Sequence, residues 1–82
     1  MIGREVIALA GKERGQKFVI VNLDDKFVYL ADGKRLKANK SKRKSPKHIE
    51  LLEDRLKLQT SELKEERVNA KIRKFLKRSK NV

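Results

Sequence analysis

The sequence predicts a small, mainly β domain that ends in an α-helical segment. Three observations support this fold class. Short runs rich in β-branched residues are separated by glycine-containing turns, and apolar residues recur at helical spacing near the C-terminus. The chain has 82 residues, of which 38% are hydrophobic and 41% charged, so it suits one small domain with a thin core.

Four strands are predicted in the N-terminal half. The runs Glu5–Ala10 and Phe18–Leu23 are apolar and β-branched. Apolar residues in the second run fall on both faces, which is typical of a strand that is covered on both sides or strongly coiled. Phe27–Ala31 follows, and Asp32-Gly33 favours a type I′ hairpin turn into a returning strand, Arg35–Ala38. Short strands with apolar residues on both faces suit a small barrel.

The C-terminal half predicts a basic loop, one more strand and a helix. Residues 39–47 contain nothing large and apolar, so a solvated loop is expected. Lys47–Leu51 alternates like a strand, although a helix that begins at Pro46 is an alternative. The charged stretch 52–67 is a candidate for an extra helix. Beyond it lies a two-faced helix whose apolar stripe is Val68, Ile72, Phe75 and Leu76.

These elements divide the chain into two parts. Residues 1–52, with the basic loop 39–47, are expected to form the barrel, and residues 53–82 a charged helical extension. The apolar stripe of the helix is expected to pack on the barrel, because a narrow stripe of this kind usually faces a core.

Positive charge is concentrated in the middle of the chain. The formal net charge is +12, and residues 34–48 hold eight basic and no acidic side chains, whereas residues 1–33 hold five of each. Like charges packed this closely repel one another unless phosphates neutralise them, so the pattern favours RNA contact. The alternatives are a protein-interaction module of the transcription or translation machinery and a nonspecific nucleic-acid binder.

Other function classes are disfavoured by the composition. The sequence has no cysteine and one histidine, His48, so no metal site is expected. Nucleotide-binding loops and catalytic arrangements are absent from the sequence, so we expect no enzyme, no cofactor and no small-molecule substrate. Since no apolar stretch approaches the roughly 20 residues of a membrane helix, we expect a cytoplasmic protein. We also expect the free protein to be a monomer.

Residues 3–21 resemble the KOW motif of ribosomal proteins and NusG-type elongation factors, and the resemblance centres on Gly11-Lys12-Glu13-Arg14-Gly15. Glycines four apart suit a tight turn where the backbone comes close to a partner, and Lys12 and Arg14 add charge at its tip. Together with Phe27–Lys34, the basic run and Lys47-His48-Ile49, most of the chain resembles the small bacterial KOW-domain RNA-binding proteins. These are similar to KOW-bearing large-subunit ribosomal proteins of archaea and eukaryotes.

The resemblance implies an SH3-like barrel of about five strands whose loops contact ribosomal RNA, with ribosomal proteins as further candidate partners. Gly11 and Gly15 are expected to shape the KOW turn. Phe18 and Phe27 are assigned to the core, whereas Tyr29 remains open between core packing and base stacking. The expected RNA-binding residues are Lys12, Arg14, Lys17, Lys34, Arg35, Lys37, Lys40, Lys42, Arg43, Lys44, Lys47, His48, Lys71, Lys74, Lys77 and Arg78.

Overall fold

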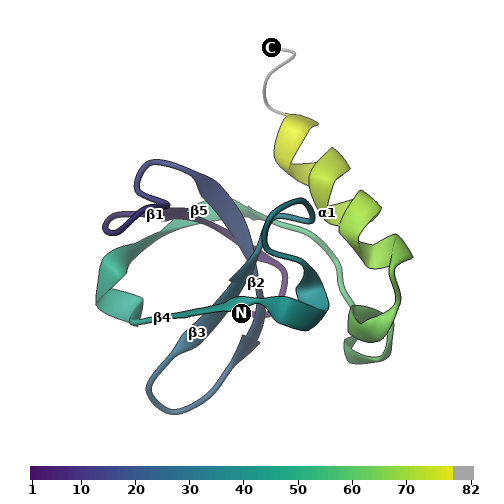
Figure 1. The fold of residues 1–82 in the computed structure, drawn as a ribbon, viewed down its shortest axis with the longest axis horizontal. Coiled ribbons are helices and arrows are strands. Elements are labelled where there is room, and N and C mark those ends of the chain that lie inside the picture. Colours follow the sequence, from purple (N-terminus) through teal and green to yellow (C-terminus); the bar gives the residue numbers. More distant parts are fainter. Residues whose placement is uncertain (79–82) are drawn as a thin grey trace.

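A computed structural model describes residues 1–78 and has one five-stranded antiparallel sheet with a C-terminal helix (Figure 1). The strand order is β4-β3-β2-β1-β5. This arrangement confirms the expected mainly β fold of about five strands with a helical C-terminal segment. The elements are β1 (Arg4–Ala8), β2 (Lys17–Leu23), β3 (Val28–Ala31), β4 (Lys42–Lys44), β5 (Ile49–Arg55) and α1 (Arg67–Lys77), with 3₁₀ turns η1 (Ala38–Lys40), η2 (Pro46–His48) and η3 (Thr60–Lys64).

The sheet is apolar on both faces and separates two cores. Inside the curled sheet, Phe18 and Ile20 of β2 pack with residues of β1 and β3. On the outer face, Val19 and Val21 of the same strand pack with Ile72 of α1. The alternation along β2 therefore confirms the prediction of a strand covered on both sides. It also explains how a short chain buries enough apolar surface, because one strand serves two cores.

The prediction of a strand at Arg35–Ala38 is wrong, because the structure has no strand there. The Asp32 carboxylate accepts the backbone N–H groups of Lys34 (2.9 Å) and Leu36 (3.0 Å), which folds the chain into a compact loop. Within residues 1–78 only glycines have positive φ, so Asp32 lacks the conformation that a type I′ turn requires at its first central position. A side chain that binds nearby backbone in this way competes with a strand ladder.

The partner strand of β3 comes instead from the expected basic loop. β4 pairs Lys44 with Val28 and Lys42 with Leu30, so residues 39–47 are a 3₁₀ turn, a strand and a second turn instead of a solvated loop. Leu36 packs against the inner core. The strand was expected at residues 35–38 because the apolar Leu36 alternates with basic residues, but Leu36 packs from a loop. Residues 39–47 were expected to be a loop because they are basic, but Lys42 and Lys44 of β4 pair with Glu13.

The strand predicted at Lys47–Leu51 is confirmed as β5, which continues to Arg55. It therefore crosses the expected domain boundary at 52/53, and that division stays a prediction. The stretch 52–67 holds the 3₁₀ turn η3, whose capping box joins Gln59 and Glu62. Residues 79–82 of the expected extension lie outside the described residues.

The helix α1 packs on the outer face of the sheet through the predicted stripe, in which Val68 and Ile72 are buried. Beside the stripe, the buried Asn69 accepts the backbone N–H of Ala38 at 2.9 Å. Gly33 lies under the helix with φ +80°, and a Cβ added there would stand 2.3 Å from the Asn69 carbonyl oxygen. Helix and loop are thus in direct backbone contact. None of the helices in residues 1–78 has the length and apolarity needed to cross a membrane.

Candidate nucleic-acid interface

Three basic segments meet at one end of the sheet. β1 and β2 are joined there by the KOW turn, and because β3 is antiparallel to β2, Ala31 lies opposite Val19 at the same end. The segment before β5 also ends there, since the His48 carbonyl accepts the Leu9 N–H at 2.8 Å. We call residues 9–17, 32–36 and 45–48 the basic end. Its Lys and Arg side chains, all exposed, are Lys12, Arg14, Lys17, Lys34, Arg35 and Lys47.

The carboxylates of the basic end, Glu13 and Asp32, are already engaged. Asp32 accepts backbone N–H groups within its loop. Glu13 binds two lysines of β4, with distances of 2.9 Å to Lys42 and 3.1 Å to Lys44. The six exposed cations therefore set the local potential, which attracts a polyanion.

The opposite end of the sheet has a different charge. Its β2–β3 loop carries Asp24, Asp25 and Lys26, and Asp24 accepts the Tyr29 hydroxyl at 2.6 Å. This bond is the main reason why the pKa of Asp24 is lowered and that of Tyr29 is raised. A nucleic acid is therefore favoured at one end of the molecule over the other.

The KOW turn is held by its own backbone. Gly11 (φ +80°) and Gly15 (φ +83°) take left-handed conformations, and the Gly15 N–H donates to the Ala8 carbonyl at 2.8 Å. A Cβ built on Gly15 meets nothing within 4 Å, so the backbone at this point is open to a partner. Lys12 and Arg14 project from the tip as exposed side chains. The turn thus has the accessible backbone and the charge that its sequence predicts.

Lys42 and Lys44 differ from the sequence expectation of an unpaired basic run. Besides Glu13, Lys44 donates to the Ala10 carbonyl at 2.9 Å, and its side chain is only 10% exposed. The hydrogen bond from Lys42 is the largest cause that lowers the pKa of Glu13 to about 2. These contacts tie β4 to the KOW turn. The two lysines thus have a structural role, and their contact with RNA stays a prediction.

Arg78 also has structural partners. Its guanidinium donates to the buried Glu5 at 3.0 Å and to Asp54, and it lies 3.8 Å above the Phe75 ring. The bond with Glu5 is the main cause that raises the pKa of Arg78. Arg78 thereby holds the end of α1 to β1 and β5, and its predicted RNA contact stays a prediction.

The remaining predicted residues are spread over other surfaces. Lys71 pairs with Glu62 at 2.9 Å, and Lys37 lies 3.5 Å from Glu66. Lys40 ends η1, and Lys74 is exposed on α1. The structure therefore gathers part of the predicted set at the basic end and leaves these four lysines outside it.

The aromatic residues do not form an open stacking platform. The predicted core position of Phe27 is wrong, because its ring is half-buried beneath the Arg43 guanidinium, 4.6 Å from the ring centroid. Phe18 is buried in the inner core as expected. Tyr29 packs at the edge of the outer core. His48 is exposed, and residues 1–78 contain no group of three or more His, Asp or Glu side chains placed to hold a metal ion.

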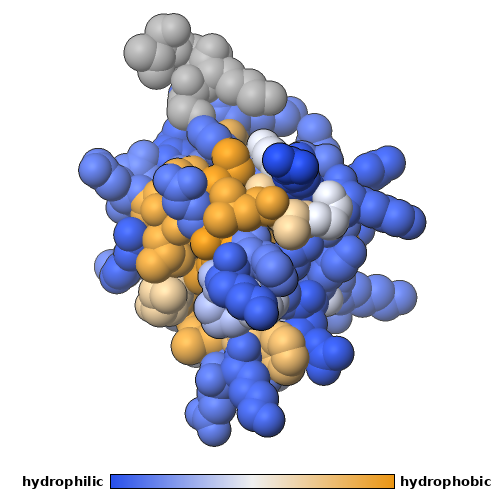
Figure 2. Space-filling view, turned by 90° about the vertical axis from the view of Figure 1, so that its left-hand side faces the viewer, coloured by the Kyte–Doolittle hydropathy of each residue, from blue (hydrophilic) through white to orange (hydrophobic). Residues whose placement is uncertain are grey.

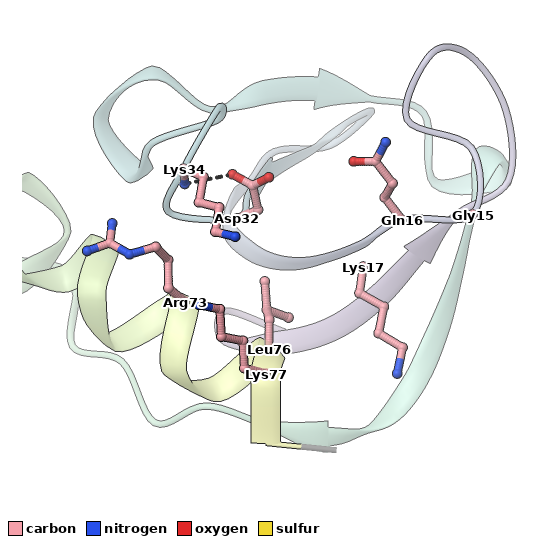
Figure 3. A pocket seen from close by; sticks show the side chains of 8 residues that line it. All are labelled: Gly15, Gln16, Lys17, Asp32, Lys34, Arg73, Leu76 and Lys77. Atoms are coloured by element: carbon pink, nitrogen blue, oxygen red, sulfur yellow. Dashed lines mark hydrogen bonds between the residues drawn. The ribbon is translucent and has the colours of Figure 1, made fainter. Parts of the chain in front are cut away.

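A cavity of about 420 Å³ adjoins the basic end, between the KOW turn, the loop after β3 and α1 (Figure 3). We call it the basic hollow. Its lining includes Arg73, which the sequence analysis missed and which donates to the Gly33 carbonyl at 2.5 Å. Its spacing of four residues from Lys77 is the sequence signal that places both on one side of the helix. The charged residues that line the hollow are Lys17, Asp32, Lys34, Arg73 and Lys77.

The fold and the basic end define a small, barrel-like β domain with a surface suited to a polyanion. Sequence comparison agrees with this class. The chain is 43% identical over 53 residues to large ribosomal subunit protein eL14 of Staphylothermus marinus. The aligned residues are 63% of this chain and 55% of that relative. It is also 35% identical over 66 residues to eL14 of Hyperthermus butylicus. Here the aligned residues are 79% of this chain and 67% of that relative.

The chain belongs to the eL14 family of large ribosomal subunit proteins. It spans about half to two thirds of the length of these two relatives. No family model matches it. Both relatives are archaeal, so they agree with the resemblance to large-subunit ribosomal proteins and give no support to its bacterial qualifier.

Proposed function

We propose that this protein binds ribosomal RNA as part of the large ribosomal subunit in the cytoplasm, in a structural and not a catalytic role. The observation that carries the proposal is the basic end, where six exposed cations accompany two carboxylates that are both engaged. The names of the two relatives, both large ribosomal subunit proteins, support the same conclusion.

The chemistry of the basic end favours recognition by charge and shape. Lys12, Lys17 and Lys34 present mobile ammonium groups for phosphate oxygens, whereas Arg14 and Arg35 offer planar donors for two oxygens at once. Such contacts release counterions and position the protein, but they carry little base information. A folded RNA that brings several phosphates together is therefore the expected ligand.

The proposal is tested by sedimentation of a tagged copy through sucrose gradients of cell lysate. At low and at moderately high salt we expect it to travel with large subunits or whole ribosomes, and to be released by ribonuclease. A protein that stays at the top of the gradient, or leaves with modest salt, would contradict ribosomal binding.

A charge-reversal pair assigns the binding to the basic end. Replacing Lys12, Arg35 and Lys47 by Glu should abolish co-sedimentation. The control variant replaces Lys26, Arg55 and Lys57, which are exposed and lie outside the basic end, and has the same net charge change. Equal loss of binding in both variants would mean that net charge, and not this surface, determines association. Lys42 and Lys44 are left intact because their replacement would disturb the fold.

A protein contact is the second candidate function, and an exposed apolar area favours it. Figure 2 shows apolar side chains gathered within a largely hydrophilic surface. Two large apolar side chains are separately exposed, Leu9 next to β1 (46%) and Leu51 within β5 (42%). A neighbouring ribosomal protein is a suitable partner for such an area. Replacing both residues by Ser should then weaken incorporation into subunits while the affinity for naked ribosomal RNA is unchanged.

A further inference from the structure

The basic hollow is built by three segments that are far apart in sequence. Lys17 begins β2, Lys34 belongs to the loop after β3, and Arg73 and Lys77 lie on successive turns of α1. Figure 3 shows Leu76 between Lys17 on one side and Arg73 and Lys77 on the other, with the Arg73 guanidinium directed away from Leu76. Because α1 is fixed to the loop through Asn69 and Gly33, the folded protein already holds the three walls in place.

The cations of the hollow are available to a ligand. Lys17, Lys34 and Lys77 form no ion pair within residues 1–78. The single carboxylate of the lining, Asp32, accepts backbone N–H groups of its own loop (Figure 3). Four positive charges around one cavity repel one another, so an anionic ligand lowers the free energy of this arrangement.

Arg73 gives the hollow a fixed donor. One guanidinium nitrogen, Nη1, donates to the Gly33 carbonyl at 2.5 Å, which restrains the planar group at the wall. The other two nitrogens of the Arg73 guanidinium have no hydrogen-bond partner within residues 1–78. A guanidinium held in this way is prepared to bind phosphate oxygens without a further loss of side-chain entropy.

The size and the remaining lining select among anions. The hollow is a half-open depression of about 420 Å³, which has room for more than a single inorganic anion. Leu76 supplies an apolar surface, and Gly15, which has no side chain and has open space beside it, leaves room at the rim. The combination suits a sugar or base next to charged phosphates.

We propose that the basic hollow is a nucleotide-sized RNA subsite, in which Lys17, Lys34, Lys77 and Arg73 bind consecutive phosphates and Leu76 contacts the nucleoside between them. The inference rests on the proposed RNA-binding function and adds to it a defined place, where Arg73 joins the already expected Lys77 on α1. It gives the C-terminal helix a role that the turn-centred sequence motif does not include.

The test uses the full chain and 5′-phosphorylated diuridylate, which carries two phosphates, as the probe. Backbone amide NMR titration should show the largest shifts at Gly15, Gln16 and Lys34, with a further shift at Leu76 that inorganic phosphate does not produce. Replacing Lys17, Lys34 and Lys77 by Gln should reduce the affinity at least about tenfold, because each phosphate contact contributes severalfold at moderate salt.

The matched control replaces Lys26, Lys57 and Lys64 by Gln. All three are exposed, form no ion pair within residues 1–78 and lie outside both the hollow and the basic end, so the same charge is removed. We expect it to reduce the affinity at most about threefold, since only long-range attraction is weakened. Equal losses in the two triple variants, or shifts centred away from α1, overturn the subsite. Equal shifts at Leu76 with inorganic phosphate would identify a simple anion site and also overturn it.

A second measurement separates this inference from the proposed function. If both triple variants bind large-subunit RNA as tightly as the unaltered protein, the hollow is not a subsite although RNA binding stands. If the unaltered protein binds no ribosomal RNA, both proposals fail. The variant Arg73→Lys keeps the charge and should lower affinity for the dinucleotide, because the planar fork is lost.

Discussion

At the scale of single residues, Glu13 is the one carboxylate between the two glycines of the KOW turn. Its carboxylate lies between Lys42 and Lys44 and joins the turn to β4. The sequence places an acid between two glycines of a basic motif without indicating its partners, since β4 lies almost 30 residues away and was predicted to be a loop.

We expect Glu13→Gln to destabilise the protein by about 1 to 2 kcal/mol at neutral pH, because a charge-assisted contact is lost. The pKa of Glu13 is lowered from 4.5 to about 2, so its contribution is complete above about pH 4.5 and disappears as the pH falls through 2. Urea unfolding between pH 2 and 6 should therefore show a smaller pH dependence in the variant. Glu53→Gln, at an exposed position, is the control, and an unchanged pH dependence would exclude this role for Glu13.

Substitutions at two glycines with nearly identical φ distinguish the cost of backbone strain from the cost of a steric clash. Gly15 and Gly33 both have φ near +80°, but only Gly33 lies against α1. Gly15→Ala should cost about 1 to 2 kcal/mol, the penalty of a left-handed residue. Gly33→Ala should cost at least about 2 kcal/mol more, because its Cβ would stand 2.3 Å from the Asn69 carbonyl oxygen. Thermal unfolding followed by circular dichroism compares the two, and equal losses would contradict the close packing.

At the scale of elements, the attachment of α1 depends on one buried polar side chain. Asn69 is 2% exposed and accepts the Ala38 N–H. Asn69→Ala should destabilise the protein by about 1 to 3 kcal/mol, since a partly buried N–H loses its acceptor. Lys74→Ala, on the exposed side of the same helix, should change stability by less than about 0.5 kcal/mol. Denaturant unfolding measures both, and a stable Asn69 variant would show that the attachment of the helix does not depend on this hydrogen bond.

The elements that the sequence predicts well have local signals. β1, β2, β3 and α1 are visible in apolar periodicity, which depends only on neighbouring residues. β4 is not visible, because a Lys-Arg-Lys strand is stabilised by Glu13 and by pairing with β3, both distant in sequence. The basic hollow was missed for the same reason. Its walls come from three segments, and the spacing of Arg73 from Lys77 indicates only a shared helix side, without showing that Lys17 and Lys34 lie next to it.

At the scale of the whole molecule, the separation of charge between the two ends predicts how binding depends on salt. If the basic end and hollow contact about five phosphates, a plot of log K against log salt for ribosomal RNA should have a slope of about −3.5 to −4.5. A protein interface formed by exposed apolar residues such as Leu9 or Leu51 would give a much shallower slope. Fluorescence anisotropy across a salt series distinguishes them. Equal affinity for duplex DNA and ribosomal RNA would instead indicate a nonspecific binder.

The edge position of β4 has a further consequence for the free protein. Beyond β4 no strand follows in the sheet formed by residues 1–78, so its outer backbone groups are unpaired within the sheet. Such an edge invites another chain to add a strand, and three consecutive cations on a short strand oppose it by mutual repulsion between copies. Lys42, Arg43 and Lys44 outnumber the single carboxylate of Glu13, so this edge keeps a net positive charge that opposes self-association of the free protein.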